Sequence, residues 1–336
     1  MKAIRLAFVL SAVFATTAML SGCNEPKIED LVSIEVTKPA NKTTYAVGEV
    51  FSPDGMVVTA HYSTGASQKV YDYSYYPGEP LKTTDSQITI LYHEKEAYCP
   101  ILVRNNFDDS YYQTINPNSN TLRNDLYTLN NSKIDHLVTF SVMLSNASHG
   151  FYVTDPGVGD RTITTFYSGN SHRGTTGLNR EHVWPKSHGG NLVEDDIHMV
   201  RPTLEAENGS RGNSFYVEGK RDEFNGWDPA MESFGKESYR GDAARIIFYC
   251  AIANLNLTIV DMDYHATSNK NPDNMMGKLS DLLKWNLRYP VQSREMVRND
   301  GAQTLQGNRN PFIDHPEYAC KIWGNTNATT RQICGM

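Results

Sequence analysis

The chain has 336 residues, a formal net charge of −7 and a hydrophobic fraction of 39%. This length predicts two domains or one large one, and the composition supplies enough apolar side chains for ordinary cores. Beyond the first 20 residues, no apolar run approaches the roughly 18 residues that a membrane-spanning helix needs. Proteins that bind nucleic acids usually carry a basic surface, so the acidic balance argues against that class unless specific motifs support it.

The chain begins with the pattern of a bacterial export signal. Lys2 and Arg5 precede an apolar run over residues 6–20, which is too short for a comfortable membrane span. Residues 20–23, Leu-Ser-Gly-Cys, resemble the lipobox of bacterial lipoproteins. The resemblance implies cleavage before Cys23 and lipidation of its thiol. The alternative is an ordinary secretory signal with an incidental cysteine.

A lipidated Cys23 would anchor the protein stably, because each buried CH₂ of its acyl chains adds about 0.8 kcal/mol. We therefore expect a signal peptide over residues 1–22 and a lipid-anchored tether over residues 23–29. Asn24 is not the aspartate that favours inner-membrane retention. We expect an exported protein that is anchored to the outer membrane, on its periplasmic side or at the cell surface.

Export places the other four cysteines in an oxidising compartment. Cys320 and Cys334 lie close together in the sequence. A disulfide between them would close a loop of about 15 residues and contribute about 3 kcal/mol. Cys250 lies in an apolar helical run and is predicted to be a buried thiol, whereas the sequence assigns no pairing to Cys99.

Residues 30–104 predict an all-β domain. Runs of β-forming residues, separated by Gly and Pro, lie at 32–36, 55–62, 87–92 and 99–103. Short strands at such spacing are typical of a small sandwich. Residues 44–49 and 54–58 resemble the bacterial Ig-like modules of cell-surface proteins. Such modules usually serve as spacers or adhesive units, and no catalytic group is evident in this one.

The pattern changes after residue 104. Residues 105–119 are rich in Asn and Asp and predict a linker or surface loop. Residues 120–336 predict a second domain of mixed α and β structure. Its apolar residues at helical spacing predict helices over 121–130, 241–257 and 276–287, and a last one from Pro290, at a first helical position, to about residue 306.

The residues that carry chemistry gather between 180 and 213. Residues 180–185 read Arg-Glu-His-Val-Trp-Pro and follow a Gly- and Ser-rich segment. Asp-Ile-His at 196–198 comes next, and residues 207–213 read Glu-Asn-Gly-Ser-Arg-Gly-Asn. These blocks predict a short strand, a second strand and a helix that begins near Leu204.

Hydrolysis of a phosphodiester bond fits this set of side chains. A neutral His182 can take a proton from water near neutral pH. A hard cation can neutralise the phosphate and stabilise the leaving oxygen. Mg²⁺ takes only one or two protein ligands, a demand that Glu181 and the amide oxygen of Asn208 would meet. Arg211 and Arg245 are candidates for bidentate phosphate contacts, with structural ion pairs as the alternative.

Five sequence blocks resemble the bacterial endonuclease I family. They lie, in the family's order, at 180–185, 196–198, 207–213, 241–249 and 306–318. The resemblance implies a mixed α+β nuclease domain with a ββα-metal (His-Me finger) core. In that core His182 is the general base, Glu181 is a metal ligand, and Asn208 is the ligand from the helix. Met199 and Ser210 stand where the family commonly has Asn and Asp, which puts secondary contacts in doubt.

The resemblance also implies the substrate and the ion. We expect a nonspecific endonuclease that hydrolyses DNA, with RNA left open as a second substrate, and that leaves 5′-phosphate products. The ion is expected to be Mg²⁺, with Ca²⁺ or Mn²⁺ as alternatives. No obligate protein partner is evident. On a regular strand Glu181 and His182 would face opposite sides, so either the strand ends there or the ion and the phosphate flank its edge.

Two other functions remain open at this point. His182, His188 and His198 lie close enough in the sequence to ligate zinc in a zinc-dependent hydrolase. The Ig-like domain also fits a surface adhesin or binding lipoprotein with an inactive hydrolase domain. For His198 we favour a structural role, and for Trp184 a place in the core. Residues 278–309 hold six basic and three acidic residues, and this excess predicts either a phosphate-tracking surface or a solvated helix face.

Overall fold

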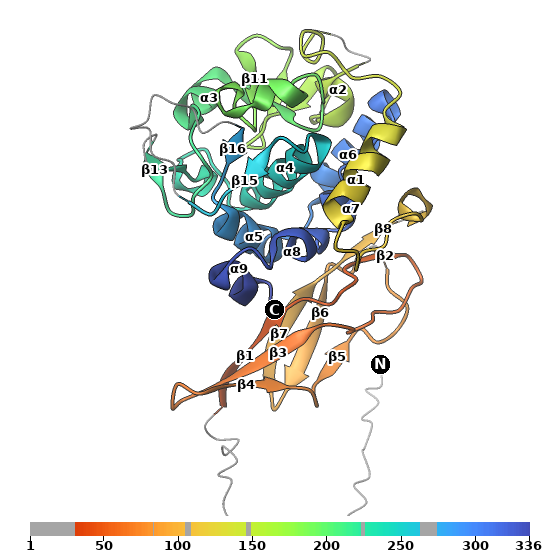
Figure 1. Cartoon of the computed structure of the whole chain (residues 1–336), viewed down its shortest axis with the longest axis vertical. Helices are drawn as coiled ribbons and strands as arrows, with labels where there is room; N and C mark the ends of the chain where they lie inside the picture. The colour runs from red at the N-terminus through yellow and green to blue at the C-terminus, as the bar shows by residue number, and fades with distance from the viewer. Residues whose placement is uncertain (1–30, 83, 105–108, 146–148, 223–225, 263–273) are drawn as a thin grey trace, which may run out of the picture.

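The computed structural model describes residues 31–82, 84–104, 109–145, 149–222, 226–262 and 274–336. A β-rich N-terminal part lies below a larger part of mixed α and β structure (Figure 1). The predicted signal peptide, the tether and the lipidation site Cys23 lie outside the described residues. Within the described ranges, no helix is both long and apolar enough to cross a membrane.

The N-terminal part is built from strands, as predicted. Two antiparallel three-stranded sheets and one parallel pair share a single hydrophobic core, in which alternate residues such as Val58, Ala60, Ile88 and Ile90 are fully buried. The first sheet contains β1 (Leu31–Lys38), β3 (Val57–Tyr62) and β4 (Ser67–Val70), and the second contains β5 (Ser74–Tyr76), β6 (Gln87–Tyr92) and β7 (Lys95–Pro100). The parallel pair is β2 (Thr44–Ala46) with β8 (Leu102–Arg104).

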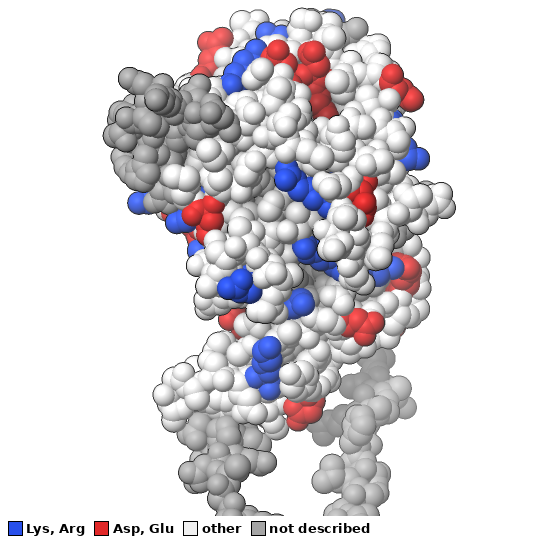
Figure 2. Space-filling view, in the orientation of Figure 1, with Lys and Arg blue, Asp and Glu red and all other residues white. Residues whose placement is uncertain are grey.

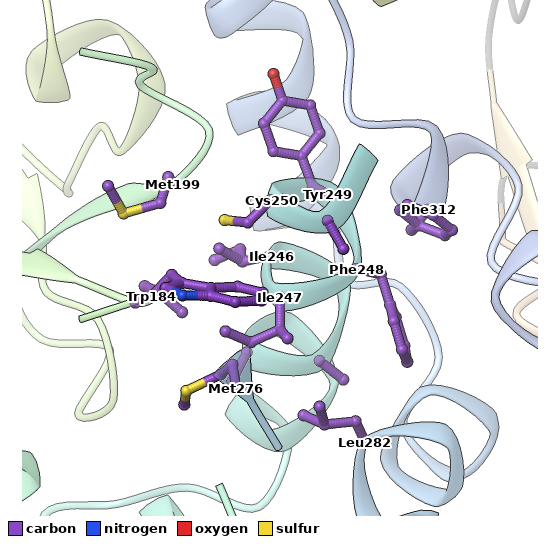
Figure 3. Close-up of a cluster of buried hydrophobic side chains, with 14 of the residues drawn as sticks. Trp184, Met199, Ile246, Ile247, Phe248, Tyr249, Cys250, Met276, Leu282 and Phe312 are labelled. Carbon is purple, nitrogen blue, oxygen red and sulfur yellow. The ribbon is translucent and has the colours of Figure 1, made fainter. Parts of the chain in front are cut away.

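The second part is organised around the central helix α4 (Tyr239–Ala253). Every residue from Tyr239 to Ile252 is buried, so the helix presents no face to solvent and forms the core itself. Figure 3 shows its apolar side chains between Trp184 and Met199 on one side and Phe312 on the other. The other helices are α1 (Leu122–Lys133), α2 (Phe151–Thr154), α3 (Glu205–Arg211), α5 (Leu279–Arg288), α6 (Ser293–Gln306), α7 (Pro311–Asp314), α8 (Tyr318–Trp323) and α9 (Ala328–Ile333).

Several boundaries differ from the sequence predictions, and two of these differences have a clear physical reason. Helix α6 begins at Ser293 rather than at Pro290, because the Gln292 N–H donates to the carboxylate of Glu295 and caps the helix there. Part of the predicted linker 105–119 belongs to the second domain. Tyr112, in a 3₁₀ turn, is buried, and its hydroxyl donates to Asp314 Oδ2 at 2.7 Å.

Short strands form two-stranded ribbons around the core helix. The ribbon that carries the predicted chemistry pairs β11 (Leu178–His182) antiparallel to β12 (Val200–Leu204), and β12 continues directly into α3. Thr203 donates to the carboxylate of Glu207 at 2.9 Å, and this bond fixes the first turn of α3 on the strand. The other ribbons pair β9 (Thr162–Thr164) with β10 (Ser171–Arg173), β13 (Arg221–Asp222) with β14 (Gly226–Trp227), and β15 (Thr258–Ile259) with β16 (Met275–Met276).

The two parts are joined by charged and polar contacts. Arg104, at the end of β8, pairs with Asp314 at 2.6 Å and with Asp300 at 2.9 Å. Thr44 donates to the backbone carbonyl of Asp314 at 2.6 Å. Asp314 is fully buried and is also held by Arg309. The β-rich domain therefore docks on the second domain through a shared buried carboxylate.

Candidate active site

Glu181 lies near the end of β11 and points into the protein. The residue is 1% exposed, and its Oε1 accepts a hydrogen bond from the Tyr167 hydroxyl at 2.8 Å. Arg211 Nη1 lies 3.3 Å from the same oxygen. Burial raises the pKa of Glu181 to about 7, although the charge of Arg211 and the bond from Tyr167 act to lower it. Oε2 accepts no hydrogen bond from the residues that the structure describes, which leaves it available to a cation.

His182, the last residue of β11, lies in a different environment. Its ring packs against Phe140, with 4.6 Å between the ring centroids, and Nε2 lies 3.6 Å from Glu194 Oε2. Burial lowers the pKa of His182 to about 4, and the nearby Lys186 charge lowers it further, whereas Glu194 acts to raise it. The imidazole is therefore neutral at pH 7, which is the form that a general base requires.

The strand alternates through these two residues rather than ending before them. Glu181 pairs with Arg201 and His182 pairs with Val200 in a regular antiparallel register. Neighbouring side chains on such a strand point to opposite faces. The carboxylate and the imidazole therefore flank the end of the strand, and the strand does not end before Glu181 and His182.

Helix α3 packs on the Glu181 face of the ribbon. Its Glu207 binds Thr203, which lies on the same ribbon face as Glu181, and its Arg211 reaches Glu181 itself. Asn208 lies one helical turn before Arg211 and is half-buried. Its side-chain amide makes no hydrogen bond with any described residue. The helix thus brings Asn208 to the same side of the ribbon as the Glu181 carboxylate.

The predicted phosphate contact of Arg211 is not supported. Arg211 is 1% exposed, and it donates to the backbone carbonyls of His182 at 3.0 Å and Val183 at 2.7 Å. These bonds tie α3 to the end of β11. The guanidinium therefore holds the backbone that presents His182, and it is not exposed to a nucleic acid.

Arg245 is also a structural residue, contrary to the predicted phosphate contact. It is fully buried in α4 and binds both carboxylate oxygens of Glu295, at 2.6 Å and 2.8 Å. Its remaining nitrogen donates to the backbone carbonyl of Tyr289 at 3.0 Å. All of its donors are used inside the core, so none can reach a substrate.

The three histidines of the zinc alternative do not form a ligand set. His188 is buried, and its Nε2 lies 3.0 Å from the Asn213 carbonyl. His198 is buried against Tyr249, and its Nε2 lies 3.2 Å from the Asn308 carbonyl. Over the described ranges, no three His, Cys, Asp or Glu side chains cluster as metal ligands. The expected structural role of His198 and core position of Trp184 are confirmed.

The basic excess over residues 278–309 does not form a phosphate-tracking surface. Arg298 and Arg309 are buried with Asp155 and Asp314, and Arg294 binds Asp242 at 2.7 Å. Over the face drawn in Figure 2, basic and acidic side chains are interspersed and most of the surface is uncharged. Several of the basic side chains of this segment are thus paired inside the protein and do not add to its surface charge.

The cysteines follow the predicted pattern. Cys320 and Cys334 form a disulfide across 14 residues, and Cys99 and Cys250 are free and buried. Sequence reasoning missed the residues that set the environment of the candidate site: Phe140, Tyr167, Glu194 and Tyr216. Tyr167 donates to Glu181, and Tyr216 shares a hydrogen bond with Tyr167. Glu194 lies near the His182 ring, which Phe140 covers. Only Glu194, in the loop between the two strands, was near enough in the chain to be suspected.

Comparison with known proteins identifies the family of the chain. The family model for endonuclease I matches residues 112–317, which is more than half of the chain. The chain belongs to the endonuclease I family. A model for the bacterial Ig-like domain (group 3) matches residues 38–72 in the β-rich part.

Two curated proteins resemble this endonuclease I family member. It is 39% identical over 160 residues to the extracellular ribonuclease of Bacillus amyloliquefaciens, a match that covers 43% of this chain and 53% of the relative. It is 36% identical over 172 residues to the extracellular ribonuclease of Bacillus subtilis (strain 168), covering 46% and 58% respectively. The matches thus span little more than half the length of either relative. The chain accordingly combines a segment that matches the endonuclease I family with an Ig-like module that precedes it.

Proposed function

We propose that this endonuclease I family member is an exported, metal-dependent nuclease with little sequence preference, which hydrolyses DNA and RNA to 5′-phosphate products. The observation that carries the proposal is the pair of consecutive residues at the end of β11. Glu181 supplies a buried carboxylate on the face that α3 covers, and His182 supplies a neutral imidazole on the other face. The names of the two Bacillus relatives favour RNA as one of the substrates.

The donor set fits a hard cation of the Mg²⁺ type. Carboxylate and amide oxygens are the ligands that such ions prefer, and Mg²⁺ keeps several of its waters. Glu181 Oε2 and the Asn208 side chain are the two candidate ligands, and Ca²⁺ or Mn²⁺ would accept the same donors. A bound cation would favour the ionised form of Glu181, which burial disfavours. When bound, the ion neutralises the phosphate and stabilises the leaving oxygen. This is the ββα-metal core of the proposal, made by β11, β12 and α3.

In this proposal His182 takes the proton from the attacking water. Nε2 faces Glu194, so Nδ1 is the nitrogen that receives the proton. As the ring becomes positive, the Glu194 carboxylate 3.6 Å away stabilises it. Arg211 keeps the His182 carbonyl fixed, so the ring stays at the end of the strand. Arg211 thus orients the base, burial keeps it neutral before the reaction, and Glu194 stabilises the positive charge that it gains.

The cellular setting completes the proposal. Residues 1–22 act as a signal peptide, and lipidated Cys23 anchors the mature protein, through the tether 23–29, to the outer membrane. The Ig-like domain (30–104) holds the nuclease domain (120–336) off the membrane. Extracellular relatives support export as such. The competing roles, an inactive adhesin-like lipoprotein or a zinc-dependent hydrolase, have no supporting geometry within the described residues.

The deciding experiment uses purified protein that lacks residues 1–29, incubated with plasmid DNA or with RNA. We expect degradation with Mg²⁺ that EDTA abolishes. His182→Ala should lower kcat by about 100-fold or more, since a positioned base contributes 10²–10⁴-fold. Asn208→Ala should raise the Mg²⁺ concentration needed for half-maximal rate. His61→Ala, a half-exposed histidine of the Ig-like domain, is the matched control. Full activity of His182→Ala would overturn the assignment of the base.

A further inference from the structure

A polar pocket lies beside the end of β10 and the turn that leads into β11, the strand that carries Glu181 and His182. Its volume is about 390 Å³, and its lining includes Arg161, Arg173 and Tyr152. Arg173 ends β10, directly before the short turn that leads into β11. None of these three residues belongs to the candidate ligand set or contacts the general base. The pocket is therefore a separate feature of the nuclease domain.

The two arginines are held side by side by the backbone. Arg173 pairs with Thr162 of β9, the residue after Arg161. The N–H of Gly174, the residue after Arg173, donates to the Arg161 carbonyl at 2.9 Å. Both side chains are exposed. Neither guanidinium makes a hydrogen bond or an ion pair with any residue in the described ranges, in contrast to the buried, paired arginines such as Arg245.

Arg161 occupies a backbone position that favours other residues. Its φ is +51°, in the left-handed region. A residue with a Cβ there costs roughly 1–2 kcal/mol, whereas Gly adopts this conformation freely and Asn is tolerated. The backbone conformation of the turn therefore does not explain why an arginine stands at position 161. A role for its side chain in the pocket accounts for the residue that is found.

The chain connects the pocket to both ends of β11. Leu144 and Ser145 line it and follow Phe140, whose ring covers His182 at 4.6 Å. Thr175 also lines it, three residues before the start of β11. The strand from Leu178 to His182 extends about 13 Å. Charges along one strand of a duplex are about 3.4 Å apart along its axis, so the length of this strand corresponds to a few phosphates.

We infer that Arg161 and Arg173 form a phosphate-binding subsite for a single polynucleotide strand, a few nucleotides from the bond that is cleaved. Guanidinium groups bind phosphate in bidentate fashion, and unpaired ones are free to do so. Tyr152 supplies a half-buried ring for a stacked base. Asp160 is adjacent in the chain but does not line the pocket. The inference rests on the proposed nuclease function, for which it names the contact that holds the strand.

The test replaces both charges without disturbing the turn. Arg161→Asn suits the left-handed backbone, and Arg173→Gln keeps a long polar side chain. The control, Lys69→Gln with Arg331→Gln, removes the same charge from exposed positions on β4 and α9. Binding of a single-stranded oligonucleotide of roughly 12 nucleotides, within the size range of single-strand sites, is measured in EDTA at several salt concentrations. The measurement uses the full mature chain and does not depend on cleavage.

We expect the pocket variant to bind the oligonucleotide about 10-fold more weakly, while the control variant binds as the parent does. The slope of log K against log salt should fall by about 1.4, since each phosphate contact on a single strand contributes about 0.7. With Mg²⁺, KM for the oligonucleotide should rise, and hydrolysis of a small aromatic phosphodiester, too short to reach the pocket, should be unchanged. These results would support the subsite.

Two outcomes separate this inference from the nuclease assignment. If the parent cleaves but the pocket variant matches the control variant in affinity and salt slope, the subsite is wrong and the nuclease function stands. If the parent shows no metal-dependent cleavage while the pocket variant alone loses oligonucleotide binding, the nuclease function is wrong and the binding subsite stands.

Discussion

Nε2 of His182 lies 3.6 Å from Oε2 of Glu194, and the same carboxylate oxygen lies 2.5 Å from Lys186 Nζ. The carboxylate is thus shared between a fixed cation and a ring that is neutral until it accepts a proton. Burial and, to a smaller extent, the Lys186 charge lower the pKa of His182, whereas Glu194 acts in the opposite direction. The imidazole is therefore neutral at rest, and the Glu194 carboxylate would stabilise the positive charge of the ring if it accepted a proton.

Glu194→Gln should therefore lower kcat by about 10-fold with little change in KM. The amide keeps the shape of the side chain but no longer stabilises the imidazolium, and Lys186 is left without its counter-charge. A fall of this size corresponds to about 1.4 kcal/mol in the barrier. Steady-state kinetics on one oligonucleotide substrate would measure it. Glu79→Gln, which changes an exposed carboxylate of the Ig-like domain, should leave kcat unchanged. An equal fall in kcat in both variants would contradict the role of Glu194.

Stability should fall as the pH drops below about 6.5. Burial lowers the pKa of His198 from 6.5 to about 4. Between these values the unfolded chain binds the proton and the folded chain does not, so acidification favours unfolding. A shift of this size is worth up to about 3 kcal/mol. Chemical denaturation at a series of pH values would measure the trend.

His198→Gln is the matched variant for that pH series. Its amide can still donate to the Asn308 carbonyl that His198 Nε2 contacts at 3.2 Å, but it does not titrate. We expect a shallower dependence of the free energy of unfolding on pH between 6.5 and 4. An unchanged slope in this variant would show that another group is responsible, His188 being the next candidate because burial also lowers its pKa to about 4.

Arg245→Met should destabilise the protein by about 3–5 kcal/mol, because Glu295 would remain buried without its counter-charge. The double variant Arg245→Met/Glu295→Gln removes both charges, and the glutamine keeps an acceptor for the Gln292 N–H. It should recover most of the loss. Urea denaturation measures both variants. A stable Arg245→Met protein with a raised KM would instead point to the phosphate contact that the structure argues against.

Arg104→Ala should loosen the contact between the Ig-like and nuclease domains. The loss of its two ion pairs is expected to cost about 1.5–3 kcal/mol, while Arg309 still pairs with Asp314. All four tryptophans lie in the nuclease domain. Unfolding followed by tryptophan fluorescence should therefore separate from unfolding followed by far-UV circular dichroism. Lys42→Ala, which breaks an exposed pair within the Ig-like domain, should leave the two transitions coincident with those of the parent.

The domain order, the strand–strand–helix unit and the family follow from the sequence, because they depend on patterns that are local in the chain. Alternation and helical spacing predict strands and helices. Glu181, His182 and Asn208 lie within sequence blocks that resemble the family, so the candidate site could be predicted from the sequence. The disulfide between Cys320 and Cys334 is equally local, since only a short loop separates the two residues.

The roles of the arginines were decided by tertiary structure. Arg245 forms an ion pair with Glu295, which is 50 residues away in the sequence. The Phe140 ring covers His182, which is 42 residues away. No local pattern encodes such pairs, because a charged side chain is stable in the core only where a distant partner compensates its desolvation. For the same reason, composition could not reveal that Arg298 and Arg309 are buried, whereas Arg161 and Arg173 are exposed and have no ion-pair partner in the described part of the chain.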